Sequence, residues 1–199
     1  MNKESLSENQ VKELNKYLEV YDKGTTSTPG VYGHKNWGEG IYPRIEALNI
    51  NSILDIGCGK GVFVNDMVSK FNIEEVYGAD IASVSTGKYI QNNKIKWLDC
   101  MAHNIPLEDN KIEYIVSFDC LEHCLEEDVE GIVNEFNRVC TKGLILKIAY
   151  RQAGERSPKG EVLHMTVQPE GWWIEQFSKR FDFKENYKGY LIFNKKSTQ

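Results

Sequence analysis

The chain has 199 residues, of which 41% are apolar and 27% charged, so it can bury a core and is too apolar to remain disordered. We therefore expect one domain over residues 1–199. The net charge of −5 comes without any run of Lys and Arg, which argues against nucleic acid as a partner. Without a long apolar span or an apolar leader, we expect a cytoplasmic protein with no membrane partner. The sequence indicates no particular oligomeric state.

Two helices are predicted before the first strand. Apolar side chains recur at three- and four-residue spacings over residues 5–22. Ser7 precedes Gln10 by three residues, as in a capping box, and this supports a helix beginning there. A second, shorter helix is expected at 41–49.

The segment between these helices, residues 23–40, is rich in Gly, Ser and Thr yet contains Tyr32, His34 and Trp37. Two interpretations stay open: the aromatic side chains fold over a bound molecule, or they anchor the loop to its own core. Under the first interpretation, residues 1–49 form a helical lid.

The rest of the chain, residues 50–199, is predicted to form an α/β core, because strand-like and helix-like segments alternate from residue 52 onward. Apolar strands in such repeats indicate a parallel sheet that is covered on both faces. The last two strands are separated by little more than Lys188 and Gly189, which predicts a hairpin. The expected strands are 52–57, 74–80, 95–99, 112–119, 143–150, 180–187 and 189–196, and the expected helices between them include 61–71, 83–91 and 125–140.

A glycine-rich turn, DIGCGKG, follows the first strand. At the carboxyl end of a parallel strand, such a turn brings backbone N–H groups and a helix N-terminus to a ligand. A dinucleotide fingerprint that starts at Gly57 would need its third glycine at the position of Val62. The next strand ends in Asp80, whose carboxylate could accept both hydroxyls of a ribose. The pattern favours a ribose-bearing ligand that has no essential pyrophosphate.

The motifs DIGCGKG, VYGAD, WLDC and IEYIVSFD followed by CLEH resemble, in this order, those of class I S-adenosylmethionine-dependent methyltransferases of the small-molecule, type 11/12-like kind. The resemblance is close over residues 50–150 and looser in the flanks. It implies a Rossmann-like, doubly wound α/β fold with a seven-stranded, mostly parallel sheet that ends in an antiparallel C-terminal hairpin. It also implies S-adenosyl-L-methionine as the cofactor.

The same resemblance implies a set of cofactor-binding residues. The glycine loop would bind the amino-acid part, Asp80 the ribose hydroxyls, and residues 99–102 the adenine. An aromatic face near the sulfonium would stabilise it by about 0.5–2 kcal/mol. The expected cofactor-binding residues are Tyr32, Trp37, Asp55, Gly57, Cys58, Gly59, Gly61, Asp80, Ile81, Asp99, Cys100, Met101, Phe118 and Asp119.

The catalytic residues are predicted to be few, since orienting the acceptor against the electrophilic methyl group supplies much of the rate. If the acceptor is a hydroxyl, a general base is useful. His123, just past the fourth strand, is the first candidate, and His164 in the segment after the fifth strand is the second. His34 and Glu122 are further candidates, and a helix-capping role for His123 stays open.

No metal is expected, because Cys120, His123 and Cys124 lack an identifiable fourth ligand and the CxxC spacing that zinc sites commonly show. The segment after the fourth strand also lacks the motifs of DNA methyltransferases. We therefore predict methyl transfer to a small-molecule acceptor. The alternatives are a non-catalytic module that binds the same cofactor or a partner and, less favoured because of Val62, an NAD-dependent oxidoreductase.

Overall fold

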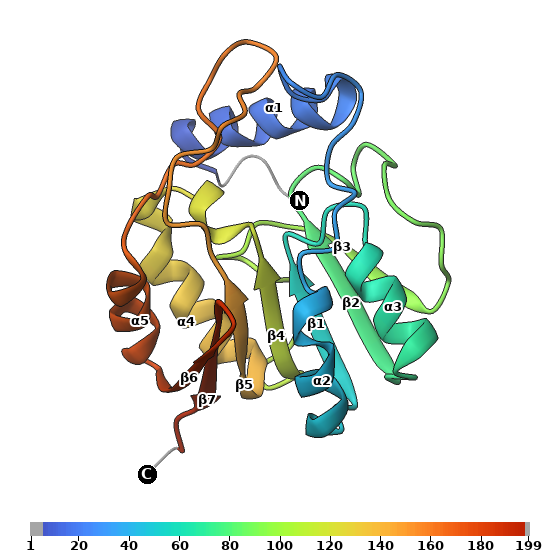
Figure 1. The fold of residues 1–199 in the computed structure, drawn as a ribbon, viewed down its shortest axis with the longest axis vertical. Helices are drawn as coiled ribbons and strands as arrows, with labels where there is room; N and C mark the ends of the chain where they lie inside the picture. Colours follow the sequence, from blue (N-terminus) through green and yellow to red (C-terminus); the bar gives the residue numbers. More distant parts are fainter. Residues whose placement is uncertain (1–5, 198–199) are drawn as a thin grey trace.

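The computed structural model describes residues 6–197, which form a seven-stranded sheet between two layers of helices (Figure 1). The strand order is β3-β2-β1-β4-β5-β7-β6. Strands β1 to β5 are parallel, and β7 runs antiparallel to both β5 and β6. The expected fold is thereby confirmed. The strands are β1 (Ser52–Ile56), β2 (Glu75–Asp80), β3 (Ile95–Asp99), β4 (Ile112–Phe118), β5 (Cys140–Lys147), β6 (Phe181–Tyr187) and β7 (Tyr190–Lys195).

The predicted C-terminal hairpin forms around a two-residue turn. Lys188 and Gly189 have φ angles of 53° and 86°, and two consecutive positive φ values are the geometry of the tight turns that join twisted antiparallel strands. The Asn186 side chain accepts a hydrogen bond from the backbone N–H of Gly189 at 2.8 Å, which supports the turn.

Four helices cover the two faces of the sheet. Side chains of α2 (Tyr42–Leu48) and α3 (Val62–Lys70) pack on one face, and those of α4 (Val129–Val139) and α5 (Glu170–Ser178) pack on the other. Each face carries its own buried cluster, as expected when apolar strands are covered on both sides. None of the helices within residues 6–197 has the length and apolarity required to cross a bilayer.

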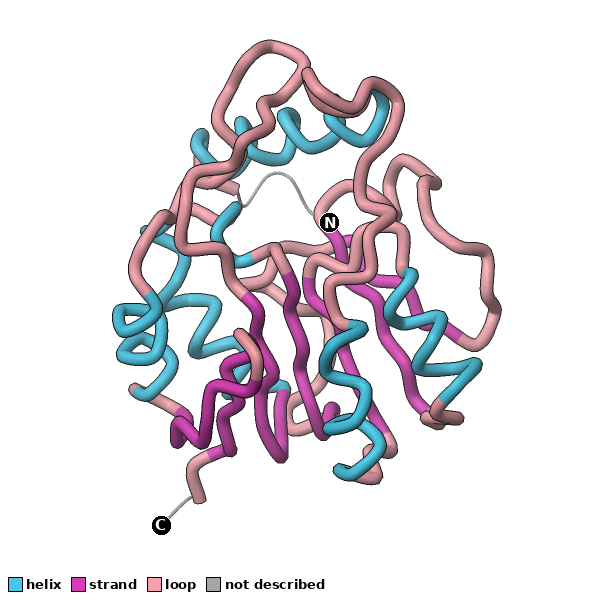
Figure 2. Tube along the Cα trace, in the orientation of Figure 1, coloured by secondary structure: helices cyan, strands magenta, loops and turns pink. Residues whose placement is uncertain are grey.

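The remaining long helix, α1 (Glu8–Lys23), lies across the carboxyl ends of the strands (Figure 1). Its start is the predicted capping box: the Ser7 hydroxyl accepts from the Gln10 N–H, and the Gln10 side chain accepts from the Ser7 N–H. The helix expected over residues 5–22 is confirmed with shifted bounds: it runs from Glu8 to Lys23, Ser7 is its N-cap, and residue 5 lies outside the described range. Loops gather beneath and beside α1 at the same end of the sheet (Figure 2).

The helix expected at residues 83–91 does not form. The Thr86 hydroxyl donates to the Ala82 carbonyl at 2.8 Å, and the Ser85 hydroxyl approaches the same carbonyl at 3.2 Å. Gly87 then takes a φ of 66°, which no α-helix contains. Ser and Thr side chains compete with the backbone for its hydrogen bonds in this way, and the segment forms turns instead.

Candidate active site

A cavity of about 390 Å³ lies between α1 with its following loop and the carboxyl ends of the central strands. Its walls bring together residues from the glycine turn, the end of β2, the segment after β4 and the segment after β5. Of the predicted site residues, those that line the cavity are Tyr32, His34, Trp37, Asp55, Gly57, Cys58, Gly59, Asp80, Ile81, Cys100, Met101, Phe118, Asp119, His123 and His164. Gly61, Asp99 and Glu122 do not line it.

Neighbouring parts of the protein, and not only the cavity, require glycine in the turn after β1. Gly57 and Gly59 have φ angles of 76° and 57°, a region that residues with a Cβ rarely adopt. A Cβ at Gly57 would collide with the Cys120 side chain, and one at Gly59 would stand 2.5 Å from the Gly33 carbonyl oxygen. That oxygen also accepts from the Lys60 N–H at 2.6 Å. The loop after α1 therefore sits directly on the glycine turn.

Asp80 is buried, with 6% of its surface exposed, and both carboxylate oxygens accept hydrogen bonds. The N–H groups of Ala82 and Ser83 donate to Oδ1 at 2.8 Å. The Gly59 N–H at 3.1 Å and the Tyr21 hydroxyl at 3.0 Å donate to Oδ2. Burial raises the pKa of this carboxyl group, against the lowering effect of these donors. Four donors fill the acceptor sites of a carboxylate, and one of the four is a hydroxyl group.

Three tyrosines cover this part of the cavity. The rings of Tyr21 and Tyr32 meet edge to face with centroids 5.3 Å apart, and Tyr17 lies 6.2 Å from Tyr32. Burial raises the pKa of all three phenols. Tyr17 and Tyr21 were not among the predicted site residues. Their four-residue spacing on the buried face of α1 is the signal that places both hydroxyls on the same side of the helix.

Trp37 is more open than Tyr32, with 38% of its surface exposed. The ammonium groups of Lys35 and Lys147 lie 5.0 and 5.5 Å from the centroid of its ring. In this structure the ring therefore already interacts with two cations. A contact between Trp37 and the sulfonium stays a prediction.

His123 ends a short 3-10 helix, Leu121–His123, and is held through Nδ1. The Leu163 carbonyl oxygen lies 3.0 Å and the Tyr17 hydroxyl 2.5 Å from this nitrogen. Burial, and next the neighbouring His164, lower the pKa of His123 to about 3. The imidazole is therefore neutral at physiological pH.

His164 comes from the segment after β5 and meets His123 inside the cavity. The two rings lie edge to face with centroids 4.7 Å apart. The N–H groups of Met165 and Thr166 donate to the Glu122 carbonyl at 2.8 and 3.0 Å, which fixes this segment beside the end of β4. The Nδ1 atom of His164 lies 2.6 Å from the Arg151 carbonyl oxygen. Two histidines distant in the sequence thus become neighbours.

Glu122 lies behind the two histidines and is completely buried. Its Oε1 accepts from the Ala149 N–H at 3.0 Å, whereas Oε2 has no hydrogen-bond partner among the described residues. Burial, and next the charge of Asp119, raise the pKa of Glu122 to about 8. One carboxylate oxygen of Glu122 and one ring nitrogen of each histidine all lie within 4.8 Å of one another. Sequence reasoning considered Glu122 only as a base.

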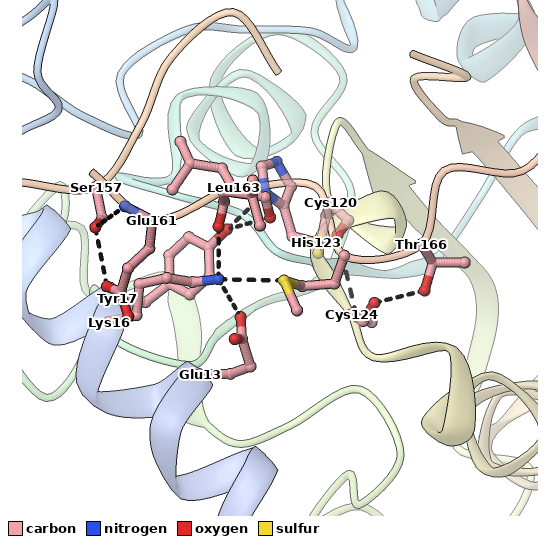
Figure 3. A network of polar contacts seen from close by, with 12 residues as sticks. Glu13, Lys16, Tyr17, Cys120, His123, Cys124, Ser157, Glu161, Leu163 and Thr166 are labelled. Carbon is pink, nitrogen blue, oxygen red and sulfur yellow. Dashed lines mark hydrogen bonds and ion pairs between the residues drawn. The ribbon is translucent and has the colours of Figure 1, made fainter. Parts of the chain in front are cut away.

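A buried lysine of α1, Lys16, fastens this helix to the segment after β5 and is paired with Glu13 of the same helix (Figure 3). Lys16 and Glu13, which are 4% and 8% exposed, are paired at 2.5 Å. The Lys16 ammonium also donates to the Val162 carbonyl at 3.0 Å. Within the same segment, the Ser157 hydroxyl donates to the Glu161 carboxylate at 2.9 Å. The wall of the cavity that carries His164 is therefore tied to the helix that covers it.

Comparisons with known proteins were made for the sequence and for the fold. Residues 53–143 match the family model described as a methyltransferase domain. This segment contains the glycine turn, Asp80 and β4, which form one side of the cavity. Residues 53–143 belong to a methyltransferase domain, and the sheet around them has the class I methyltransferase fold.

The solved structures that resemble this methyltransferase share its fold at low sequence identity. The 1,6-didemethyltoxoflavin-N1-methyltransferase of Burkholderia thailandensis, solved with 1,6-didemethyltoxoflavin and S-adenosylhomocysteine, has a TM-score of 0.61 and 11% identity, with 100% of this chain and 94% of that chain covered. An S-adenosylmethionine (SAM)-dependent methyltransferase from Methanosarcina mazei has a TM-score of 0.59 and 20% identity, with 77% of this chain and 97% of that chain covered. The [4+2]-cyclase SpnF has a TM-score of 0.53 and 18% identity, with 78% of this chain and 62% of that chain covered. No curated protein matches the sequence.

S-adenosylmethionine is the cofactor of this methyltransferase, and the cavity fits it. Gly57 and Gly59 present backbone without a side chain at the cavity wall. Asp80 already accepts a hydroxyl group, that of Tyr21, where a ribose hydroxyl is expected. Ile81 and Met101 supply apolar surface on the same side. These residues would hold the nucleoside of the bound cofactor.

Some residues that were predicted to bind the cofactor make other contacts in the structure. The ring of Trp97 occupies the space that a Cβ at residue 61 would need. Glycine is therefore required at position 61 by packing between the start of α3 and β3, and not by a ligand. Asp99 lies at the end of β3 in register with Asp80 and outside the cavity wall. The neighbouring Trp172 and Trp173 do not line the cavity: Trp173 is 1% exposed in the core, and Trp172 is half-buried.

Proposed function

We propose that this methyltransferase transfers the methyl group of S-adenosylmethionine to a small-molecule acceptor bound under α1. The observation that carries the proposal is that one cavity contains both the nucleoside side, with the glycine turn and Asp80, and a polar side with His123 and His164. A cavity of about 390 Å³ is within the range of small-molecule sites.

The cofactor, when bound, supplies an electrophilic methyl group. The residues of the chain then have to orient the acceptor, exclude water and accept the acceptor's proton. α1 and its loop exclude water, because their tyrosines and Gly33 close the cavity above Asp80 and the glycine turn. Orientation and the removal of water together contribute several kcal/mol to methyl transfer, up to about 7–11 kcal/mol for ideal alignment.

His123 and His164 are the proposed catalytic residues. Both line the cavity and both engage a backbone carbonyl through Nδ1, which leaves Nε2 available for the acceptor. Arg151 lies in the same wall, where its guanidinium could bind an acidic group of the acceptor.

The test is a screen of metabolite pools for release of S-adenosylhomocysteine by the full chain, followed by identification of the methylated product. We expect turnover with a small molecule, and we expect Asp80→Asn to abolish most of it at limiting cofactor. Binding of S-adenosylhomocysteine without turnover in any pool would support the non-catalytic alternative. Turnover confined to protein or nucleic acid fractions would contradict the proposed acceptor class.

A further inference from the structure

The polar side of the cavity brings together one buried carboxyl group and two imidazoles that a single ligand could join. Glu122 Oε2 is fully buried and has no partner among the described residues, and ring nitrogens of His123 and His164 lie within 4.8 Å of a carboxylate oxygen of this residue. The carboxyl group of Asp119 lies close enough to raise the pKa of Glu122. An unpaired buried acceptor costs about 1–3 kcal/mol, and more when it is charged. The cluster therefore calls for a ligand that is positive or donates hydrogen bonds.

The protons of the two imidazoles can be assigned from their partners. With the His123 proton on Nδ1, the Leu163 oxygen at 3.0 Å and the Tyr17 oxygen at 2.5 Å both accept from it, and the Tyr17 hydroxyl donates to the Leu163 oxygen at 3.4 Å, so every group has a partner. The Arg151 carbonyl oxygen at 2.6 Å, which can only accept a hydrogen bond, assigns a proton to Nδ1 of His164. Each neutral ring then presents the lone pair of Nε2. Histidine ligands of metals commonly have this arrangement, with the second ring nitrogen donating to a carbonyl.

We propose that Glu122, His123 and His164 form a divalent metal site beside the methyl-transfer site. Two imidazole nitrogens and one carboxylate oxygen are a ligand set typical of first-row transition metals, such as Mn²⁺, Fe²⁺, Co²⁺ or Zn²⁺, rather than of Ca²⁺. Three protein ligands leave coordination positions open. Because His123 and His164 line the cavity, an acceptor bound in the cavity can occupy these open coordination positions. The proposal replaces the expectation from the sequence that no metal is bound.

The site deepens the proposed function, on which its role in the reaction rests, by indicating a hydroxyl-bearing acceptor. A hydroxyl oxygen bound to a divalent ion loses its proton more readily, since the cation stabilises the resulting oxyanion. The oxyanion then attacks the methyl carbon: an O–CH₃ bond forms, the S–CH₃ bond breaks, and its electron pair remains on sulfur. The products would be a methyl ether, S-adenosylhomocysteine and the proton of the hydroxyl, which would leave to solvent through the open side of the cavity. In this scheme the two histidines bind the metal instead of acting as the base.

Metal binding can be measured without turnover. The full chain, freed of metal with a chelator, is titrated with Mn²⁺ and Zn²⁺ by calorimetry and with Co²⁺ by visible absorption. We expect one equivalent to bind to the wild type, with Co²⁺ bands that indicate nitrogen and oxygen ligands. Glu122→Gln and His164→Gln should each weaken binding at least about tenfold, since removal of even outer-shell partners costs about 10–100-fold. Glu122→Gln keeps an acceptor for the Ala149 N–H, which favours folding.

His103→Ala is the matched control. This histidine also lines the cavity but lies beside Asp128, outside the cluster. It should bind the metals like the wild type. The proposal is overturned if the wild type binds none of the three ions at millimolar concentration, or if the Glu122 and His164 variants, shown to be folded by circular dichroism, bind as tightly as the wild type.

Titration with S-adenosylhomocysteine in parallel separates this proposal from the proposed function. Cofactor binding without metal binding would overturn the metal site alone. Metal binding without cofactor binding would leave the site standing and contradict the proposed reaction.

Discussion

At the scale of single residues, Tyr21 and the ribose of the cofactor compete for Asp80. The Tyr21 hydroxyl donates to Oδ2 at 3.0 Å, so cofactor binding has to displace it. Tyr21→Phe removes the competitor, and we expect it to tighten the binding of S-adenosylhomocysteine by up to about tenfold, because a hydrogen bond to a charged group contributes roughly 1.5–3 kcal/mol. Calorimetry measures the change. Tyr17→Phe, whose hydroxyl lies at His123, should leave the affinity unaltered. If Tyr21→Phe binds S-adenosylhomocysteine no more tightly than the wild type does, the Tyr21 hydroxyl and the ribose do not compete for Asp80.

Asp80 itself provides a second test at this scale. Asp80→Asn removes the charge while keeping a similar shape, and we expect it to weaken cofactor binding at least about tenfold, as the loss of charge-assisted hydrogen bonds predicts. Asp99→Asn is the comparison, because Asp99 ends the adjacent strand in register with Asp80 but does not line the cavity. A larger loss of affinity in Asp99→Asn than in Asp80→Asn would refute the ribose role of Asp80.

At the scale of secondary structure, α1 is held over the cavity by Lys16, which is paired with Glu13 within the helix and donates to the Val162 carbonyl of the segment after β5. Lys16→Met leaves the Glu13 carboxylate buried without its cation, a change that costs about 3–5 kcal/mol. We expect hydrogen exchange of α1 amides to accelerate roughly a hundredfold, while exchange in β1 and β4 stays slow. Lys12→Met, at an exposed position of the same helix, should change hydrogen exchange neither in α1 nor in β1 and β4. Unaltered exchange in Lys16→Met would mean that Lys16 does not fasten α1.

The elements also show how far sequence reasoning reaches. The helix start at Ser7 and the hairpin turn at Lys188 and Gly189 depend on neighbouring residues, and both were predicted correctly. The helix expected at 83–91 was wrong, because hydroxyl side chains bond to the backbone there. The contact of Tyr21 with Asp80 spans 59 positions and depends on where α1 is placed, which periodicity does not specify.

The same limit applies to the polar side of the cavity. The glycine turn, Asp80 and His123 were recognised because each belongs to a local motif. Glu122 and His164 come together only through hydrogen bonds between the Glu122 carbonyl and residues 165 and 166. In the sequence, His123 stands beside two cysteines, and nothing local to it points to a cluster with Glu122 and His164 in the fold.

At the scale of the whole molecule, the sheet and its helices should unfold cooperatively, since one core joins α4, α5 and the C-terminal hairpin. Trp173 is 1% exposed in that core, and Trp173→Ala should lower the free energy of unfolding by about 3–5 kcal/mol. Urea denaturation measures this loss. Trp172→Ala, at the half-buried neighbouring position, should cost clearly less. Equal losses would contradict the assignment of Trp173 to the core.

The central claim is that the cavity at the carboxyl ends of the strands binds S-adenosylmethionine and its product. Calorimetric titration of the full chain with S-adenosylhomocysteine, and separately with NADH, tests it most directly. The structure predicts one equivalent of S-adenosylhomocysteine per chain, sensitive to Asp80→Asn, and no binding of NADH. Binding of NADH with no binding of S-adenosylhomocysteine would contradict the account.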